Sequence, residues 1–208
     1  MKFNLPPTSS VPNPKADQLK SALSKIGNIG RVNMFIPIID QVLRADDGVK
    51  LPSVDHVGAA IADAGMNLVV ATGKGDAIGK AIARAAASQI GKPYSWGGGG
   101  AGGASRGIAQ GAGTVGFDCS GLTQFAYAKL GINIPRVSYQ QYSAGKSVSP
   151  GNAQAGDLVF FHPSSAGPGH VGIYLGNGTY IQAPHTGDVV KVSKLSDRND
   201  LVGIKRYR

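Results

Sequence analysis

Phe117-Asp118-Cys119-Ser120-Gly121 opens a helix that we expect to run to about Lys129 and to be closed by Gly131. Asp118 is a favourable N-cap residue, so the sulfur of Cys119 would lie in the first turn, where backbone N–H groups and the helix dipole stabilise a thiolate. A lone cysteine is more often a small buried apolar residue. The flanking sequence favours a nucleophile, because the helix follows a long glycine-rich loop suited to the wall of an open cleft.

That loop covers residues 91–116, which hold eleven glycines in 26 positions, and we expect no regular structure in it. Loops this long in a compact domain are usually functional or disordered. Before it, Asp76 is a predicted N-cap for a helix that stops at Gly91. The expected apolar face of this helix consists of Ile78, Ile82, Ala85, Ala86 and Ile90.

Downstream of the cysteine, Ser138 to Gly145 are predicted to form a short helix, and from Gly156 the pattern changes to strands. The expected strands are 157–161, 170–175, 179–183, 189–192 and 201–207. Helices followed by a run of antiparallel strands predict an α+β domain.

The first 75 residues are predicted to be distinct from this domain, which we place at residues 76–208. Residues 1–14 hold four prolines and are expected to form a flexible tail. Residues 15–75 are expected to be a helical segment, and three roles fit it: a prodomain over the cleft, a docking element for a protein partner, or packing for the main domain. Neither a secretory leader nor a membrane span is visible in the sequence, so the export route stays open.

The composition excludes several function classes. The single cysteine rules out an internal disulfide, and all 12 acidic residues are Asp, so no Glu can act as acid, base or ligand. The net charge of +9 is diffuse and no aromatic platform is visible, so we expect no nucleic-acid partner and a mild attraction to anionic cell-wall polymers instead. The cysteine and the scattered histidines lack the spacing of metal ligands, and we expect neither a metal nor another cofactor.

A cysteine nucleophile needs a base and a residue that orients the base. Four histidines are present in the chain, and His170 is the preferred base because it opens an apolar strand. A base at a strand end that faces a helix N-terminus is the papain-like arrangement.

The register of the hairpin that follows His170 predicts the third residue. A two-residue turn at Asn177-Gly178 would pair His170 with His185, whereas a three-residue loop places the apolar residues of both strands on one face. The three-residue loop puts Gln182 on the same face as His170. We therefore predict that Gln182 orients His170, with His185 as the fallback.

The residues and their order resemble the NlpC/p-sixty family of papain-like cell-wall peptidases, over about residues 87–208. The matching motifs are Gly91-Lys-Pro-Tyr94-Ser-Trp96-Gly-Gly, Phe117-Asp-Cys119-Ser-Gly-Leu-Thr, Pro135-Arg136-Val-Ser138-Tyr-Gln-Gln141, Ala155-Gly-Asp157-Leu-Val-Phe-Phe and Gly169-His170-Val-Gly-Ile-Tyr-Leu-Gly-Asn-Gly. The segment from Ala104 to Phe117 is further similar to the mycobacterial Rip-type peptidoglycan endopeptidases.

The resemblance implies a papain-like NlpC-type fold, in which helices pack on a central antiparallel sheet. It also implies hydrolysis of the bond between D-glutamate and diaminopimelate in peptidoglycan stem peptides, outside the cell or in the cell wall. Cys119 would attack the carbonyl, with His170 first as base and then as acid. The family's third polar residue is often His, and Glu in close Rip relatives; Gln182 falls at that place here.

The resemblance also implies a set of substrate-binding residues. Tyr94 aligns with a tyrosine that lines the site near the oxyanion, and Asp118 and Ser120 align with residues that help to hold the stem peptide in some members. Arg136 either faces a diaminopimelate carboxylate or is simply solvated, and Ser138 completes the set.

Two other functions stay open from the sequence. One is a non-catalytic peptidoglycan-binding or scaffold module of the same fold. The other is an amidase or acyltransferase that acts on another substrate.

Overall fold

The computed structural model describes residues 73–208, which all belong to the second of two compact units of the chain, Asp63–Arg208. The predictions for the tail at 1–14, and for the helical segment at 15–75 up to residue 72, lie outside the described residues. Between residues 73 and 208, no helix has both the length and the apolar character needed to cross a membrane.

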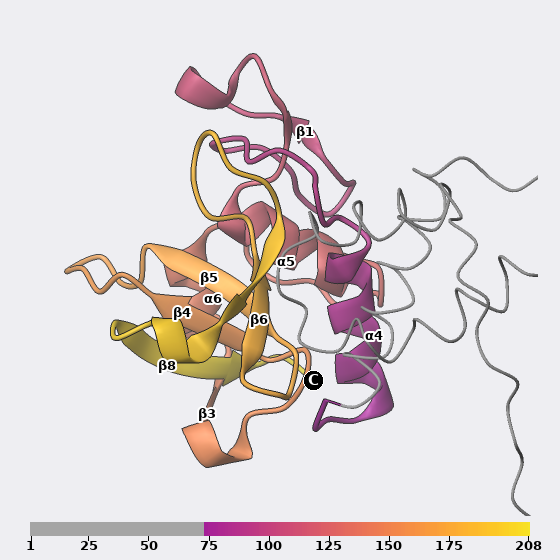
Figure 1. Ribbon diagram of the computed structural model, residues 1–208, viewed down its shortest axis with the longest axis vertical. Helices are drawn as coiled ribbons and strands as arrows, with labels where there is room; N and C mark the ends of the chain where they lie inside the picture. The colour runs from indigo at the N-terminus through magenta and orange to yellow at the C-terminus, as the bar shows by residue number, and fades with distance from the viewer. Residues whose placement is uncertain (1–72) are drawn as a thin grey trace, which may run out of the picture. The chain divides into compact units, whose positions relative to one another are not determined.

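Residues 73–208 contain three α-helices, a six-stranded antiparallel sheet and a separate two-stranded sheet (Figure 1). The helices are α4 (Ala77–Ala87), α5 (Cys119–Ala128) and α6 (Ser138–Ala144). The sheet contains β3 (Lys146–Val148), β4 (Leu158–Phe161), β5 (His170–Tyr174), β6 (Thr179–Gln182), β7 (Lys191–Lys194) and β8 (Leu201–Arg206), in the spatial order β3-β8-β4-β5-β6-β7. This architecture confirms the predicted α+β class.

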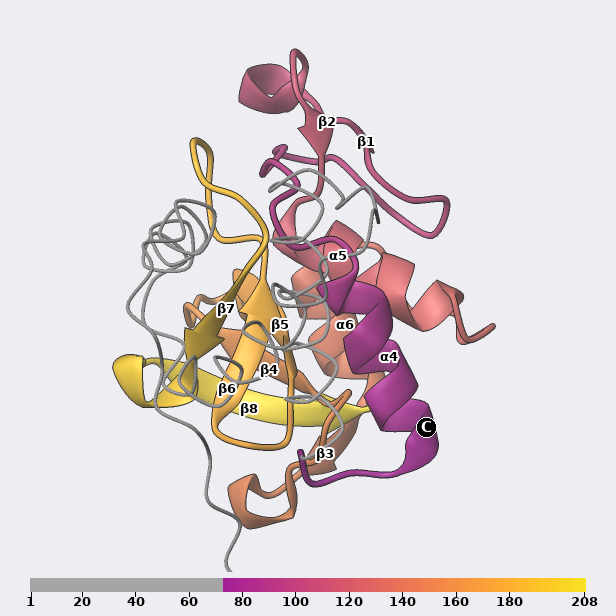
Figure 2. The same cartoon turned by 45° about the vertical axis from the view of Figure 1, so that its right-hand side comes forward.

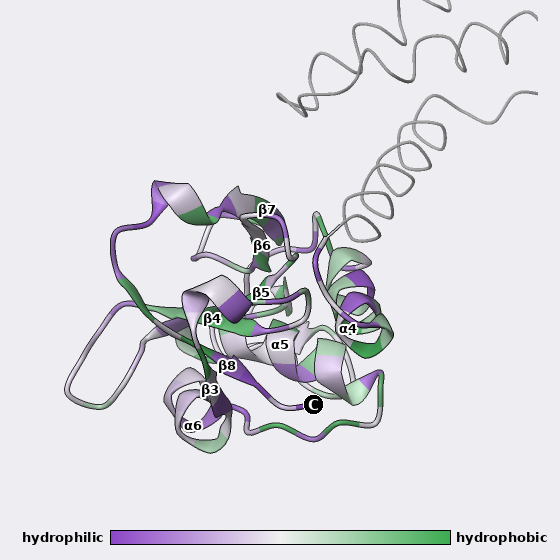
Figure 3. Ribbon diagram, turned by 90° about the horizontal axis from the view of Figure 1, so that it is seen from below, coloured by the Kyte–Doolittle hydropathy of each residue, from purple (hydrophilic) through white to green (hydrophobic). Residues whose placement is uncertain are grey.

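The core lies between the sheet and the pair α4 and α5, which pack on each other, while α5 also packs along β5 (Figure 2). The central strand β4 is buried along its whole length because both of its faces are covered. Leu158 and Phe160 join the main core, whereas Val159 and Phe161 join a smaller cluster with Tyr180. Figure 3 shows the hydrophobic residues concentrated in β4, β5 and β6 and the hydrophilic ones at the edge strand β7.

The β5–β6 hairpin has the register predicted from its alternation. Ile173 lies opposite Ile181, and the N–H of Leu175 donates to the carbonyl of Thr179 at 2.9 Å. Gly178 closes the three-residue loop with φ +82°, a left-handed conformation that glycine adopts without steric cost. This register puts His170, the first residue of β5, on the same face as Gln182, the last residue of β6.

The predicted face of α4 was wrong in part. Asp76 caps the helix as expected, since its carboxylate accepts from the N–H of Gly79 at 2.7 Å. Ile78, however, is 50% exposed. The helix ends at Ala87 and not at Gly91, so Ile90, which is 41% exposed, lies beyond it. The buried face is narrower and is made of small residues around one large one: Gly79, Ile82, Ala83 and Ala86. A helix that packs through glycine and alanine approaches its neighbour closely, and the flanking isoleucines remain outside the contact.

The expectation of a structureless loop at 91–116 was also wrong in part. The segment contains the short antiparallel pair β1 (Ser105–Arg106) and β2 (Val115–Gly116) and a turn of 3₁₀-helix at Ala109–Gly111. Strands of two residues are too short to show an alternating pattern. This small hairpin extends away from the main sheet (Figures 1 and 2).

Gly121 is the point where α5 touches the glycine-rich segment, and we predict that Gly121→Ala destabilises the protein. An added Cβ would lie 2.5 Å from the carbonyl oxygen of Gly98, which is backbone and cannot turn aside. We expect a loss of about 1–3 kcal/mol in the free energy of unfolding, as for other overpacked contacts. Denaturant unfolding followed by the fluorescence of Trp96, the only tryptophan of the chain, measures it.

Gly113→Ala is the matched control, because a Cβ there would meet nothing within 4 Å. Equal stability of the two variants would contradict the close contact at Gly121.

Candidate active site

The first turn of α5 holds Cys119 at a fixed place. Asp118 is the N-cap, and its carboxylate accepts from the N–H of Gly121 at 2.6 Å. The backbone before it is tied to the glycine-rich segment, because the N–H of Asp118 donates to Gly98 and the carbonyl of Phe117 accepts from Ser95, both at 2.9 Å. The predicted helix start is therefore confirmed, with the thiol as its first residue.

The electrostatic setting of Cys119 favours the neutral thiol in the resting protein. Burial raises the pKa of Cys119 to about 11, and the negative charge of Asp118 acts in the same direction. Hydrogen bonds from the backbone of Val171 and from the backbone and hydroxyl of Ser120 act against this rise. The bond to Val171, the residue after His170, brings the start of β5 to the sulfur.

His170 is held by Gln182 across the hairpin. Its Nε2 lies 2.6 Å from Oε1 of Gln182, and the Nε2 of Gln182 donates to the hydroxyl of Ser193 on β7 at 2.7 Å. With the amide oxygen towards the ring, the imidazole donates from Nε2 and keeps Nδ1 free to accept a proton. Both side chains are almost fully buried.

Burial lowers the pKa of His170 to about 4, although the hydrogen bond to Gln182 works in the opposite direction. A neutral imidazole at pH 7 can accept a proton, so the arrangement suits a general base. The structure thus brings His170 against Gln182, and the backbone of its neighbour Val171 against the thiol of Cys119. The thiol at the helix tip and the imidazole at the strand start are both neutral.

Asp118, Ser120 and Arg136 form one polar cluster beside the thiol. Both terminal nitrogens of Arg136 donate to the Asp118 carboxylate at 2.9 Å, and one also donates to the hydroxyl of Ser120 at 3.0 Å. The other reaches the carbonyl of Gly98 at 3.0 Å. Simple solvation of Arg136 does not fit these contacts, since the guanidinium is in a bidentate ion pair.

Tyr94 and Ser138 are both buried. Burial, followed by the charges of Cys119 and Asp118, raises the pKa of Tyr94 above its ordinary value, so the phenol stays protonated. The hydroxyl of Ser138 donates to the carbonyl of Pro168 at 2.8 Å and so supports the backbone that leads into His170.

His185, the fallback partner, lies in a different setting. Its ring is exposed, and its partners are the carbonyl of Thr186 at 3.0 Å and the carboxylate of Asp188 at 3.7 Å, both in its own loop. The structure therefore gives Gln182, and not His185, the contact with His170.

Two further residues of this region escaped the sequence analysis. Ser193 fixes the amide of Gln182, and only the pairing of β6 with β7 could have indicated it. Gln141, fully buried in α6, donates to the carbonyls of Ser120 and Pro135 and so ties α6 to the start of α5.

We predict that Gln182→Glu raises the pKa of His170, because a carboxylate stabilises the imidazolium more strongly than an amide does. A base with a raised pKa becomes protonated at a higher pH, so the acidic limb of the alkylation rate of Cys119 should move to higher pH, by about one unit or more. The rate of reaction with iodoacetamide between pH 3 and 9 measures this. An unmoved limb would contradict the contact between His170 and Gln182.

No metal site accompanies the cluster: nowhere in residues 73–208 do three His, Cys or Asp side chains gather as potential ligands.

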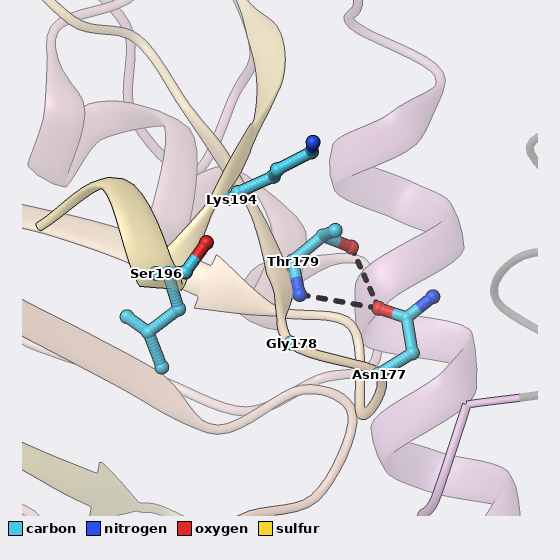
Figure 4. A pocket seen from close by; sticks show the side chains of 6 residues that line it. Asn177, Gly178, Thr179, Lys194 and Ser196 are labelled. Carbon is cyan, nitrogen blue, oxygen red and sulfur yellow. Dashed lines mark hydrogen bonds between the residues drawn. The ribbon is translucent and has the colours of Figure 1, made fainter. Parts of the chain in front are cut away.

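A separate hollow, shown in Figure 4, is lined by Asn177, Gly178, Thr179, Lys194, Leu195 and Ser196. It lies at the turn of the β5–β6 hairpin, at the end opposite to His170 and Gln182. This hollow is therefore not part of the candidate active site around Cys119 and His170.

Comparison with known proteins places the candidate site inside a known family domain. The model of the NlpC/P60 family matches residues 91–200. Peptidoglycan endopeptidase RipA of Mycolicibacterium smegmatis and RipB of Mycobacterium tuberculosis are each 51% identical over 112 residues, which is 54% of this chain and 22% and 46% of theirs. The chain thus spans less than half of the length of these curated relatives.

Among solved structures, RipD from Mycobacterium tuberculosis, described as a non-catalytic NlpC/p60 domain protein adapted to peptidoglycan binding, superimposes with a TM-score of 0.58. It is 41% identical, and the match covers 64% of this chain and 100% of the solved RipD chain. The family model covers more than half of the 208 residues and includes Cys119, His170 and Gln182. The chain belongs to the NlpC/P60 family.

Proposed function

We propose that this chain is a peptidoglycan hydrolase, a cysteine endopeptidase with Cys119 as nucleophile, His170 as base and Gln182 as the residue that orients the base. The observation that carries the proposal is the contact of His170 Nε2 with Gln182 at 2.6 Å, which leaves Nδ1 free at a strand start bonded to the thiol of Cys119 through Val171. The relatives named as peptidoglycan endopeptidases support the substrate class.

The reaction begins from a neutral pair. Because the thiol has a pKa of about 11 and the imidazole one of about 4, the proton moves from sulfur to Nδ1 during the attack rather than before it. The sulfur forms a bond to the carbonyl carbon, and the electron pair of the C=O bond moves to oxygen. The backbone N–H of Cys119 and the protonated hydroxyl of Tyr94 are the candidate donors to this oxyanion.

The tetrahedral intermediate then collapses to a thioester as His170 gives its proton to the departing amine. Water attacks the thioester with His170 again as base, which releases the carboxylic acid product and restores the thiol. We propose the bond between D-glutamate and diaminopimelate as the one cleaved, and the cluster of Asp118, Ser120 and Arg136 as the place that holds the stem peptide. This work would be done outside the cell or in the cell wall.

Incubation of purified stem peptide with the full chain, with product masses recorded, tests the proposal. The wild-type chain should split the peptide after D-glutamate into two products whose masses add up to that of the substrate plus one water, while Cys119→Ser yields none. Equal cleavage by both, or cleavage by neither even after deletion of residues 1–75, would overturn it.

A non-catalytic binding module is the second candidate, favoured by the similarity to RipD. This chain retains the thiol, the histidine and the oriented amide, which a pure binding module does not need. Binding of stem peptide without cleavage would establish this alternative, and products other than the expected pair would point to an amidase or acyltransferase.

The segment before the catalytic domain at 76–208 has a proposed role as prodomain or docking element. Deletion of residues 1–75 should raise activity if this segment covers Cys119.

A further inference from the structure

A second histidine, His162, lies against His170 and has no role in the reaction described above. It follows β4 directly and has φ +57°, a left-handed conformation that few non-glycine residues adopt. Its N–H donates to the carboxylate of Asp200 at 3.1 Å, and its carbonyl accepts from the N–H of Gly169 at 2.9 Å. Strained backbone that is held from both sides is characteristic of functional positions.

The strained backbone directs the His162 ring towards the base. The ring centroids of His162 and His170 are 5.6 Å apart, with the planes tilted by 38°. The side chain of His162 is 61% exposed, whereas His170 is 4% exposed. An imidazole open to solvent, and therefore free to exchange protons, thus packs directly on the buried imidazole.

Further charged groups surround this pair. Nε2 of His162 lies 3.6 Å from the carboxylate of Asp200, which also accepts from Arg198 at 2.6 and 2.8 Å. The Arg198 guanidinium stacks over the ring of Phe161 at 4.4 Å, and that ring packs on His170. His170 thus faces His162 at the end of β4, Arg198 and Asp200 before β8, Gln182 on β6 and, beyond Val171, Cys119 on α5.

We propose that His162 is a positioning residue of this site: its ring fixes one side of His170, and its charge, balanced by Asp200, controls how readily His170 holds a proton. The inference rests on the proposed function in that His170 is the base. With a positive charge beside it, His170 stays neutral at a lower pH and can therefore still accept a proton from the thiol there.

The sign of the effect follows from the charges. The charges of His162 and Arg198 lower the pKa of His170, and that of Asp200 raises it. A positive charge on the His162 ring opposes a second one on the His170 ring, 5.6 Å away, and the carboxylate of Asp200 offsets it. Loss of the His162 charge should therefore let His170 take up a proton at a higher pH, and loss of the Asp200 charge should have the opposite effect.

Two variants of the full chain test this. His162→Asn removes the charge with a residue that tolerates the left-handed conformation, and Asp200→Asn keeps an oxygen for the N–H of His162. We expect the NMR titration midpoint of the His170 ring to rise by about half a pH unit in His162→Asn and to fall by a similar amount in Asp200→Asn, as for a partly screened charge at this distance.

Lys129→Gln, which removes a charge at the far end of α5, should leave the midpoint in place and is the matched control. Shifts of the same sign in both His162→Asn and Asp200→Asn, or no shift in His162→Asn, would overturn the proposal. The titration is read without substrate, so it is independent of whether the chain cleaves stem peptide. If it does, the acidic limb of kcat/KM should follow the same shifts.

Discussion

His170→Ala is expected to lower kcat/KM for stem-peptide cleavage by about 10³- to 10⁴-fold, the upper range for loss of a positioned general base. The resting thiol has a pKa of about 11, so without the base almost none of it is a nucleophile at pH 7. The buried ring also leaves a cavity beside Gln182, whose amide oxygen loses its partner. Steady-state kinetics at pH 7, together with the rate of alkylation of Cys119, measure the loss.

The control for this prediction is His185→Ala, since both changes replace an imidazole side chain with a methyl group. The ring of His185 is exposed and bonds only within its own loop in the described structure, so kcat/KM should change by less than about threefold, as for surface positions in general. A comparable loss in the two variants would mean that the wrong histidine is assigned as base. Partial recovery of His170→Ala by added imidazole would support the assignment.

The contact of His170 with Gln182 could be predicted from the sequence because it depends only on the turn and the register of one hairpin. A three-residue turn that ends at Gly178 sets the register, the register sets the faces, and the faces bring His170 to Gln182. The cap at Asp118 follows in the same way from one residue type at one helix start. Contacts of this kind lie between neighbouring strands or within a single turn, where side-chain alternation and backbone geometry determine which side chains are in contact.

The remaining features depend on tertiary contacts that no local pattern contains. Arg136 is 18 residues from Asp118 in sequence, and nothing in its flanks distinguishes an ion-paired guanidinium from a solvated one. The edge strand β3 is a short polar run that pairs with β8 only because the chain returns there. His162 reaches His170 through a left-handed backbone that histidine rarely adopts and that no sequence pattern indicates.

Asp157→Asn is expected to cost about 3–5 kcal/mol of folding free energy, the range for removing one partner of a buried ion pair. Asp157 is fully buried at the start of β4, where its carboxylate accepts from Arg206 at 2.7 Å through two nitrogens and from Arg208 at 2.9 Å. The Arg208 side chain is itself only 5% exposed. An amide of the same shape would leave Arg206 without its counter-charge, and would leave the buried Arg208 with only the exposed carboxylate of Asp76, 3.1 Å from its Nε.

The exposed pair of Asp188 and Lys191 provides the comparison. Asp188→Asn breaks a surface ion pair, which typically contributes at most about 1 kcal/mol. Denaturant unfolding of the full chains, followed by Trp96 fluorescence, should therefore place Asp157→Asn well below Asp188→Asn in midpoint. If the two midpoints coincide, the Asp157 network contributes no more than a surface pair, and the ends of β4 and β8 are held together by their backbone ladder and the apolar contacts of Val159 and Ile204 alone.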